Sequence, residues 1–131
     1  MNRCVLEECQ KLSHEGKVTF PQVVGRLLEA GVERYTVDLV RSETTYYSAD
    51  GTSERVAFPS HERQAIAKDF SVDDVKAAIR AAQKDEIRFP EFVRRVLAAG
   101  CVGYTAYLHG KRVTYVGRTG DFHTEFFPGS K

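Results

Sequence analysis

Four side chains near the end of the sequence have residue types that suit acid–base chemistry or the binding of an anion. His123 and Glu125 are two positions apart, so on a β-strand they would share one face, about 6.6 Å apart. A carboxylate beside a histidine can hold one tautomer and raise the basicity of the ring. Arg118 precedes a Thr-Gly turn and Arg112 lies on the stretch before it, and an arginine can hold an anion. We treat these four as candidate ligand-binding residues, although a solvated strand face with mixed charges has the same pattern.

Two tyrosines extend this candidate site. Tyr104 and Tyr115 would form a wall beside it, and both recur in the first half of the chain as Tyr35 and Tyr46. A duplicated binding site would keep such pairs, but so would a duplicated core, because aromatic side chains pack well on half-buried strand faces. We favour packing as the main role of the tyrosines and keep Tyr104 and Tyr115 as candidate ligand contacts.

No recognised catalytic motif accompanies these residues. The glycines follow neither the Gly-x-Gly-x-x-Gly nor the Walker pattern, and there is no Gly-x-Ser-x-Gly elbow. Cys4, Cys9 and Cys101 lack the spacing of zinc ligands and cannot all pair, so we expect free thiols, no metal and no cofactor. Cys101 suits a small buried hydrophobe better than a nucleophile. His14 and His61 lie in polar stretches, which predicts solvated rings.

The bulk properties limit the class of partner. The chain has 131 residues, 19 basic and 18 acidic side chains and a net charge of +1, which argues against a nucleic-acid partner because phosphate contacts need a basic surface. It contains no apolar run long enough to span a membrane, and its first residues lack the apolar segment of a signal peptide. We therefore expect a cytoplasmic protein that binds no membrane and is a monomer or a weak dimer.

An internal repeat organises the whole chain. Residues 1–59 recur as residues 70–128 with a constant offset of 69, and 15 of the 40 positions from 20 to 59 are identical to their equivalents. A long period that is used only twice indicates duplication of one supersecondary unit. Each copy would be marginally stable alone. We therefore predict a single domain over residues 1–131, made of two repeats, a linker over 60–69 and a shared core.

The two copies predict the same series of elements, α-α-β-β-β. Ser71 is a suitable N-cap for the first helix of the second copy. The second helix of each copy begins at Phe-Pro, because proline fits the first helical turn, and Gly31 and Gly100 suit C-caps with positive φ. Alternation of apolar and polar residues then predicts strands over the ranges 35–39, 44–47, 54–58, 104–108, 112–116 and 123–127.

These elements predict an α+β fold. Consecutive hairpin strands are antiparallel, and two helices per copy must cover a sheet, so we expect antiparallel sheet packed against helices, with the copies related by a pseudo-two-fold axis. Phe20 and Phe89 should occupy equivalent, largely buried positions. We also expect a helical turn over 64–68 and a frayed end over 129–131.

Several stretches together resemble one small family. They are Phe-Pro before a Val/Leu stripe, Ala-Gly-Val-Glu-Arg-Tyr35-Thr-Val-Asp38, Thr45-Tyr46-Tyr47 and Gly110-Lys-Arg112-Val-Thr-Tyr115. The chain resembles the YbcV-like family, whose function is unknown and whose bacterial and phage members are often labelled phage envelope protein. The resemblance covers nearly the whole chain. It implies a duplicated α+β fold and carries no activity and no catalytic residues to transfer.

Three functions stay open at this point. The absence of a catalytic motif and the cleft that a duplication creates favour a non-enzymatic binding protein for a small anionic ligand or a protein partner. A small hydrolase or isomerase would use His123 and Glu125 as acid and base. A phage-derived structural protein rests on the family label alone.

Overall fold

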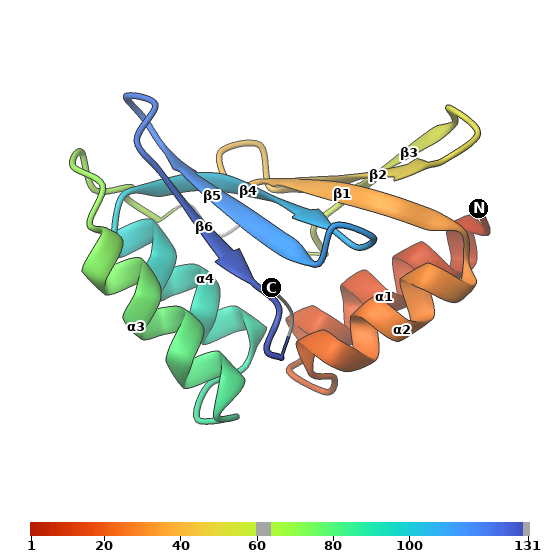
Figure 1. Cartoon of the computed structure of the whole chain (residues 1–131), viewed down its shortest axis with the longest axis horizontal. Coiled ribbons are helices and arrows are strands. Elements are labelled where there is room, and N and C mark those ends of the chain that lie inside the picture. Colours follow the sequence, from red (N-terminus) through yellow and green to blue (C-terminus); the bar gives the residue numbers. More distant parts are fainter. Residues whose placement is uncertain (60–63, 130–131) are drawn as a thin grey trace.

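The computed structural model describes residues 1–59 and 64–129 (Figure 1). In the first half the elements are α1 (Arg3–His14), α2 (Phe20–Glu29), β1 (Val32–Asp38), β2 (Glu43–Ser48) and β3 (Ser53–Ala57). In the second half they are α3 (Val72–Gln83), α4 (Phe89–Ala98), β4 (Cys101–Tyr107), β5 (Arg112–Gly117) and β6 (Phe122–Phe126). Each half thus has the order α-α-β-β-β that the sequence predicts.

The six strands form one antiparallel sheet, so the fold is α+β as predicted. The strand order is β3-β2-β1-β4-β5-β6, and β1 and β4 join the two halves at the centre. Thr36 lies opposite Thr105, 69 positions later, and Arg34 lies opposite Tyr107. A two-fold axis through the Thr36–Thr105 pair would produce this register. Superposition of the two halves stays a prediction.

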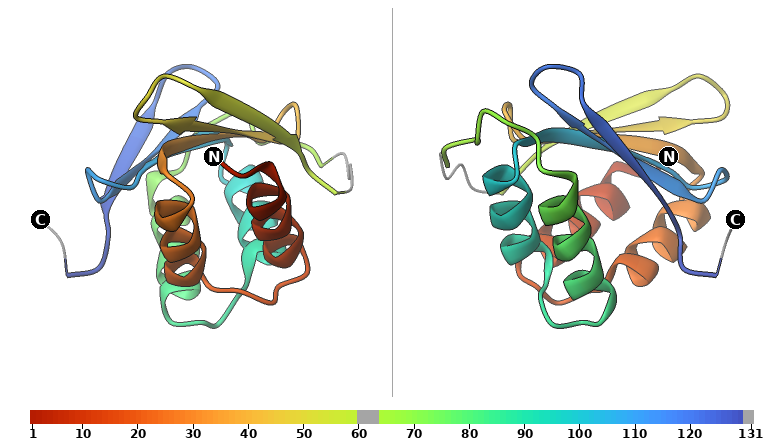
Figure 2. Two further views of the ribbon diagram at one scale, coloured as in Figure 1. Left: turned by 90° about the vertical axis from the view of Figure 1, so that its right-hand side faces the viewer. Right: turned by 60° about the vertical axis from the view of Figure 1, so that its left-hand side comes forward.

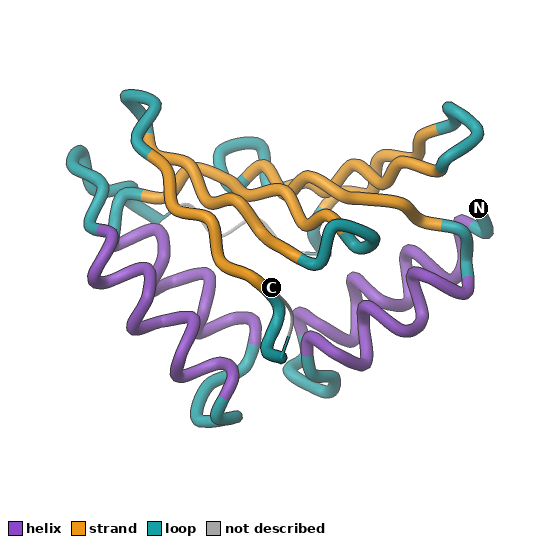
Figure 3. Tube along the Cα trace, viewed as in Figure 1, coloured by secondary structure: helices purple, strands orange, loops and turns teal. Residues whose placement is uncertain are grey.

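All the described helices lie on one side of the sheet (Figures 1 and 2). The hairpin α1–α2 packs below the first half and the hairpin α3–α4 below the second, and the two hairpins diverge from each other beneath the central strands. The opposite side of the sheet carries no helix in the described part of the chain (Figure 3). Residues of both hairpins and of the inner face of the sheet border one pocket.

The most deeply buried side chains of the helices recur at the same repeat offset. Leu6 of α1 and Val75 of α3 are fully buried, and so are Leu27 of α2 and Val96 of α4. Each pair is 69 residues apart. The fully buried residue of each helix therefore falls at the same place in the sequence repeat, and burial of a side chain of this size contributes about 1.5–3 kcal/mol.

The helix ends follow local chemistry. Thr19 and Gln22 form a reciprocal capping box at the start of α2, and the Ser71 hydroxyl accepts a hydrogen bond from the Asp74 N–H at the start of α3. Gly31 and Gly100 follow α2 and α4 with φ of +88° and +87°, which confirms the predicted positive φ. None of the helices in residues 1–59 and 64–129 is long and apolar enough to cross a membrane.

Two expectations need correction, and others lie outside the described residues. The segment 64–68 forms no helical turn; instead the Ala67 N–H donates to the Leu97 carbonyl, which ties the segment to the end of α4. Phe20 is not buried, because its ring is 39% exposed and packs against Phe127. His61, the rest of the 60–63 part of the linker and residues 130–131 lie outside the described part of the chain.

Candidate functional site

A cavity of about 340 Å³ lies between the sheet and the two helical hairpins. Both halves line it, mainly with apolar and aromatic side chains, and the C-terminal segment after β6 contributes part of the wall. Among the side chains that border it are Tyr35, Tyr46, Tyr104, Tyr115, Phe92 and Ile79. A largely apolar cavity with a few polar groups is the usual form of a small-molecule site.

Four tyrosines form the ceiling of this cavity. Tyr35 and Tyr46 pair across β1 and β2 with ring centroids 5.7 Å apart, and Tyr104 and Tyr115 pair across β4 and β5 at 5.2 Å. All four side chains are less than one-tenth exposed. The preference for packing is compatible with this burial, and the two tyrosines named as ligand contacts do border a cavity.

Three of these tyrosines have protonated hydroxyls without a side-chain hydrogen bond to the described residues. Tyr35, Tyr104 and Tyr115 make no side-chain hydrogen bond to any residue in 1–59 or 64–129, yet no buried side-chain oxygen or nitrogen in these ranges lacks a partner. The hydroxyls therefore have no side-chain partner within these ranges, and all three tyrosines border the cavity. Burial raises the pKa of each of the three hydroxyls far above its usual value. They stay protonated and can donate hydrogen bonds.

His123 and Glu125 lie together as predicted, on the inner face of β6. His123 Nε2 is 3.0 Å from Glu125 Oε1, and both side chains are largely buried. Arg80 of α3 donates to the other carboxylate oxygen, Glu125 Oε2, at 2.6 Å. The carboxylate borders the cavity. Arg112 and Arg118, which the sequence analysis grouped with Glu125, form no ion pair with it within the described residues.

The electrostatics of this cluster favour an ionised carboxylate. Burial alone raises the pKa of Glu125, but hydrogen bonds from His123 and Arg80 and the charge of Arg80 more than offset it, so the pKa lies below its usual value. Both carboxylate oxygens are occupied. The cluster ties β6 to α3, and it provides a fixed charge pair at the cavity wall rather than a basic group.

Arg112 and Arg118 lie away from the cavity. Arg112 is exposed on the outer face of the sheet, where its guanidinium stacks on the Phe126 ring at 4.6 Å. It borders a shallow hollow with Arg34, Tyr107 and His109. Arg118 is exposed beyond the end of β5. The six residues predicted as one site therefore divide between the cavity, its wall and the outer surface.

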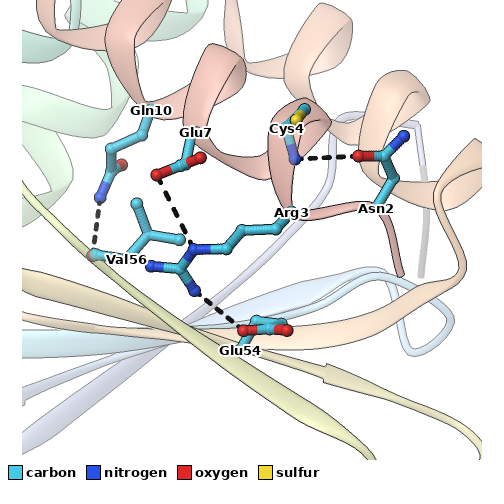
Figure 4. A network of polar contacts seen from close by, with 7 residues as sticks. All are labelled: Asn2, Arg3, Cys4, Glu7, Gln10, Glu54 and Val56. Atoms are coloured by element: carbon cyan, nitrogen blue, oxygen red, sulfur yellow. Dashed lines mark hydrogen bonds and ion pairs between the residues drawn. The ribbon is translucent and has the colours of Figure 1, made fainter.

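The first half has a different polar cluster at the equivalent place (Figure 4). The Gln10 amide is buried and donates to the Thr44 hydroxyl at 3.1 Å and to the Val56 carbonyl at 3.4 Å. Nearby, Arg3 of α1 pairs with Glu54 of β3 at 2.8 Å. An ion pair thus connects the first helix to the third strand in each half. Of the four residues in these two ion pairs, Glu125 borders the cavity and the others do not.

Two groups of aromatic rings lie where helix ends meet the segments that follow the edge strands β3 and β6. Phe20 packs edge-on against Phe127 at 5.3 Å between ring centroids. On the other side the His14 ring lies 4.4 Å from Phe58 and 4.9 Å from Phe89. The expectation that His14 is solvated is wrong: burial lowers its pKa, while a hydrogen bond from Nδ1 to the Gln10 carbonyl acts in the opposite direction.

The cysteines are free thiols, as predicted. Cys101 is fully buried, and burial raises its pKa to about 11, which agrees with a packing role. Cys9 borders the cavity, and burial raises its pKa as well. A raised thiol pKa leaves little thiolate at neutral pH, so neither is an activated nucleophile.

The sequence reasoning missed Arg80 and Gln10. Arg80 has the pattern of an ordinary exposed residue of α3, and only the fold shows that it forms an ion pair with Glu125. Gln10 carried a signal that could have been used: it is polar where its equivalent, Ile79, is apolar. No protein-family model matches the chain, and no curated protein matches it either.

Proposed function

We propose that the protein is a binding protein that holds a small, largely apolar molecule with at least one oxygen atom that accepts a hydrogen bond. The observation that carries this proposal is the set of protonated hydroxyls of Tyr35, Tyr104 and Tyr115 beside an apolar cavity. A donor in a mainly apolar wall that has no partner among the described residues can give a ligand both orientation and selectivity. The proposal extends the binding function that the sequence favours.

The size of the cavity supports a small molecule. Its volume of about 340 Å³ lies at the lower end of the range of roughly 300–1,000 Å³ that small-molecule sites occupy. The two hairpins that border it come from different halves of the chain. A ligand between them would therefore contact both repeats.

The charges near the cavity favour an uncharged ligand over the anion that the sequence suggested. The positive charge of Arg80 is matched by Glu125 and that of Arg88, which borders the cavity, by Asp85, while Arg112 and Arg118 lie outside. An anion would have to leave water for a mainly apolar space where Arg80 and Arg88 already have carboxylate partners, and burial of an unpaired charge is costly. A protein partner is a weaker proposal, since the cavity is concave and small.

The alternative of a hydrolase or isomerase draws on the 3.0 Å contact between His123 and Glu125. A general base should have a pKa near the working pH, whereas the pKa of Glu125 is lowered and both of its oxygens are engaged. A stabilising ion pair accounts for the same contacts. Membership of the YbcV-like family and a phage structural role stay proposals that rest on the resemblance alone.

A pair of fluorescent probes tests the proposal. Prodan is an uncharged naphthalene with a ketone oxygen, and anilinonaphthalene sulfonate is a naphthalene of similar size with a negative charge. We expect prodan to bind with a blue-shifted emission and the sulfonate to bind about tenfold more weakly or worse. Stronger binding of the sulfonate would restore the anionic ligand, and no saturable binding of either probe would contradict the proposal.

A matched pair of variants places the probe. Ala82 of α3 borders the cavity and Ala77 of the same helix is exposed. Ala82→Phe should fill part of the space and abolish prodan binding, whereas Ala77→Phe should leave it unchanged. Equal binding by the two variants would show that prodan binds elsewhere. Cooperative thermal unfolding of both variants would show that they are folded.

A further inference from the structure

The two edges of the sheet differ in how they are protected. β3 and β6 each have a single neighbour in the sheet, and an unpaired edge can pair with another chain unless charges, proline or a bulge prevent it. β3 carries Glu54 and Arg55. β6 begins and ends with phenylalanines that are 65% and 40% exposed, Phe122 and Phe126. The equivalent residues of β3 are the small Ser53 and Ala57.

Self-pairing of β3 would be unfavourable. Two copies of a five-residue strand that pair in antiparallel fashion about their centre place the central residue opposite itself. In β3 this residue is Arg55, so two guanidinium groups would lie directly across from each other, and like charges at that position destabilise a strand pair. The edge formed by β3 is therefore protected against a second copy.

Antiparallel pairing of two β6 strands about their centre places complementary residues opposite each other. Thr124 would lie opposite Thr124 of the second copy, and Phe122 opposite Phe126 on the outer face. On the inner face, His123 would lie opposite Glu125 of the second copy. Aromatic pairs and opposite-charge pairs each stabilise antiparallel strands. Every position of β6 thus has a suitable partner in a second β6.

The centre of the sheet already contains a pair of this kind. β1 and β4 meet about Thr36 and Thr105, whose hydroxyl oxygens are 3.0 Å apart. Thr114 and Thr124 are also directly opposite, with hydroxyls 3.0 Å apart. Thr45, Thr36, Thr105, Thr114 and Thr124 form one row across five neighbouring strands. A second β6 would continue this row without a change of register.

The edge of β6 is open to a second chain. Figure 2 shows β6 along the margin of the sheet, with α3 below it. Within residues 1–59 and 64–129, β5 is the only strand that pairs with β6. The backbone groups on its outer edge therefore have no strand partner in the described part of the chain.

We propose that β6 pairs with β6 of a second copy of this chain, which gives a two-fold symmetric dimer with one continuous sheet. Two short strands and two pairs of phenylalanines bury less surface than the roughly 1,200–2,000 Å² of a stable interface. The dimer should therefore be weak and should form in the upper micromolar range. This inference does not depend on the ligand proposed for the cavity.

Sedimentation velocity from low micromolar to near-millimolar concentration tests the dimer. The natural chain should shift from monomer to dimer, and Thr124→Arg, which copies the centre of β3, should raise the dissociation constant about tenfold or more. Arg55→Lys at the equivalent position of the other edge should leave the dimer unchanged. Phe122→Ser should also weaken the dimer while thermal unfolding stays cooperative.

Two results would overturn the proposal. One is a natural chain that stays monomeric up to near-millimolar concentration. The other is a dimer that Thr124→Arg and Phe122→Ser leave intact although both variants are folded, because the contact would then lie elsewhere. A dimer that Arg55→Lys alone disrupts would assign the interface to β3.

Discussion

Alanine at Gly31 and at Gly100 should destabilise the protein to different extents, although the two glycines are equivalent in the repeat. Both have positive φ, which an L-residue adopts at a cost of about 1–2 kcal/mol. A Cβ at Gly31 would meet no atom within 4 Å. Gly31→Ala should therefore lose only this conformational term.

A Cβ at Gly100 would collide with the chain that enters α3. It would lie 2.8 Å from the Asp69 carbonyl carbon and 2.9 Å from the Phe70 Cα, and closer still to the Asp69 carbonyl oxygen. The segment cannot move freely, because the Ser71 N–H donates to the Ala99 carbonyl at 2.8 Å. Overpacking of this kind costs about 1–3 kcal/mol. Gly100→Ala should therefore lose about 2–5 kcal/mol in total.

Urea denaturation of the two variants measures this difference directly. Gly100→Ala should lower the free energy of unfolding by about 2 kcal/mol more than Gly31→Ala, with the same denaturant dependence in both. Equal losses would refute the close approach of residues 69–70 to Gly100. A negligible loss at Gly31 would refute the argument from positive φ.

Three further predictions concern buried polar groups. Tyr104→Phe should leave the free energy of unfolding nearly unchanged, because removal of a hydroxyl costs about 1 kcal/mol only where that hydroxyl is hydrogen-bonded. The same variant should weaken prodan binding. A large loss of stability in thermal unfolding would show that the Tyr104 hydroxyl has a hydrogen-bond partner within the protein. Because burial lowers the pKa of His14, unfolding takes up a proton below about pH 6.5, so the free energy of unfolding should decrease as the pH decreases there. In urea denaturation, His14→Gln, which introduces the residue found at the equivalent position 83, should flatten this pH dependence. An unchanged pH dependence would contradict the argument. Because the pKa of Glu125 is lowered, its ion pair should stabilise the fold above about pH 4.5, and this contribution should be lost as the pH falls through the pKa of the folded state. In thermal unfolding at neutral pH, Glu125→Gln should cost about 1 kcal/mol, and the control Glu54→Gln should cost less because Glu54 is more exposed. Equal effects of the two variants would contradict the argument.

Local patterns were sufficient to predict the elements of the fold. The alternation around Tyr35 and Tyr104 gives strands, and Phe-Pro followed by an apolar stripe gives the second helix of each half. Gly31 and Gly100 end those helices as their missing Cβ suggests. These signals lie within a few residues of one another, so a single sequence contains them.

The site depended on contacts between distant residues, which the sequence does not contain. Arg80 reaches Glu125 from 45 positions away, and His14 lies between two rings from different halves. Arg118 is close to Glu125 in sequence, but it is exposed and forms no ion pair with Glu125 within the described residues. Neighbours in the sequence therefore did not identify the ion-pair partner of Glu125, and the lack of partners for the tyrosine hydroxyls within residues 1–59 and 64–129 could be recognised only from the fold.

A crystal structure of the protein with prodan tests the central claim most directly. The proposed function predicts the naphthalene rings inside the cavity and the ketone oxygen within hydrogen-bond distance of the hydroxyl of Tyr35, Tyr104 or Tyr115. It also predicts that Ala82→Phe crystals soaked in the same way contain no probe there. A cavity without prodan, or hydroxyls that are all paired within the protein, would contradict the claim.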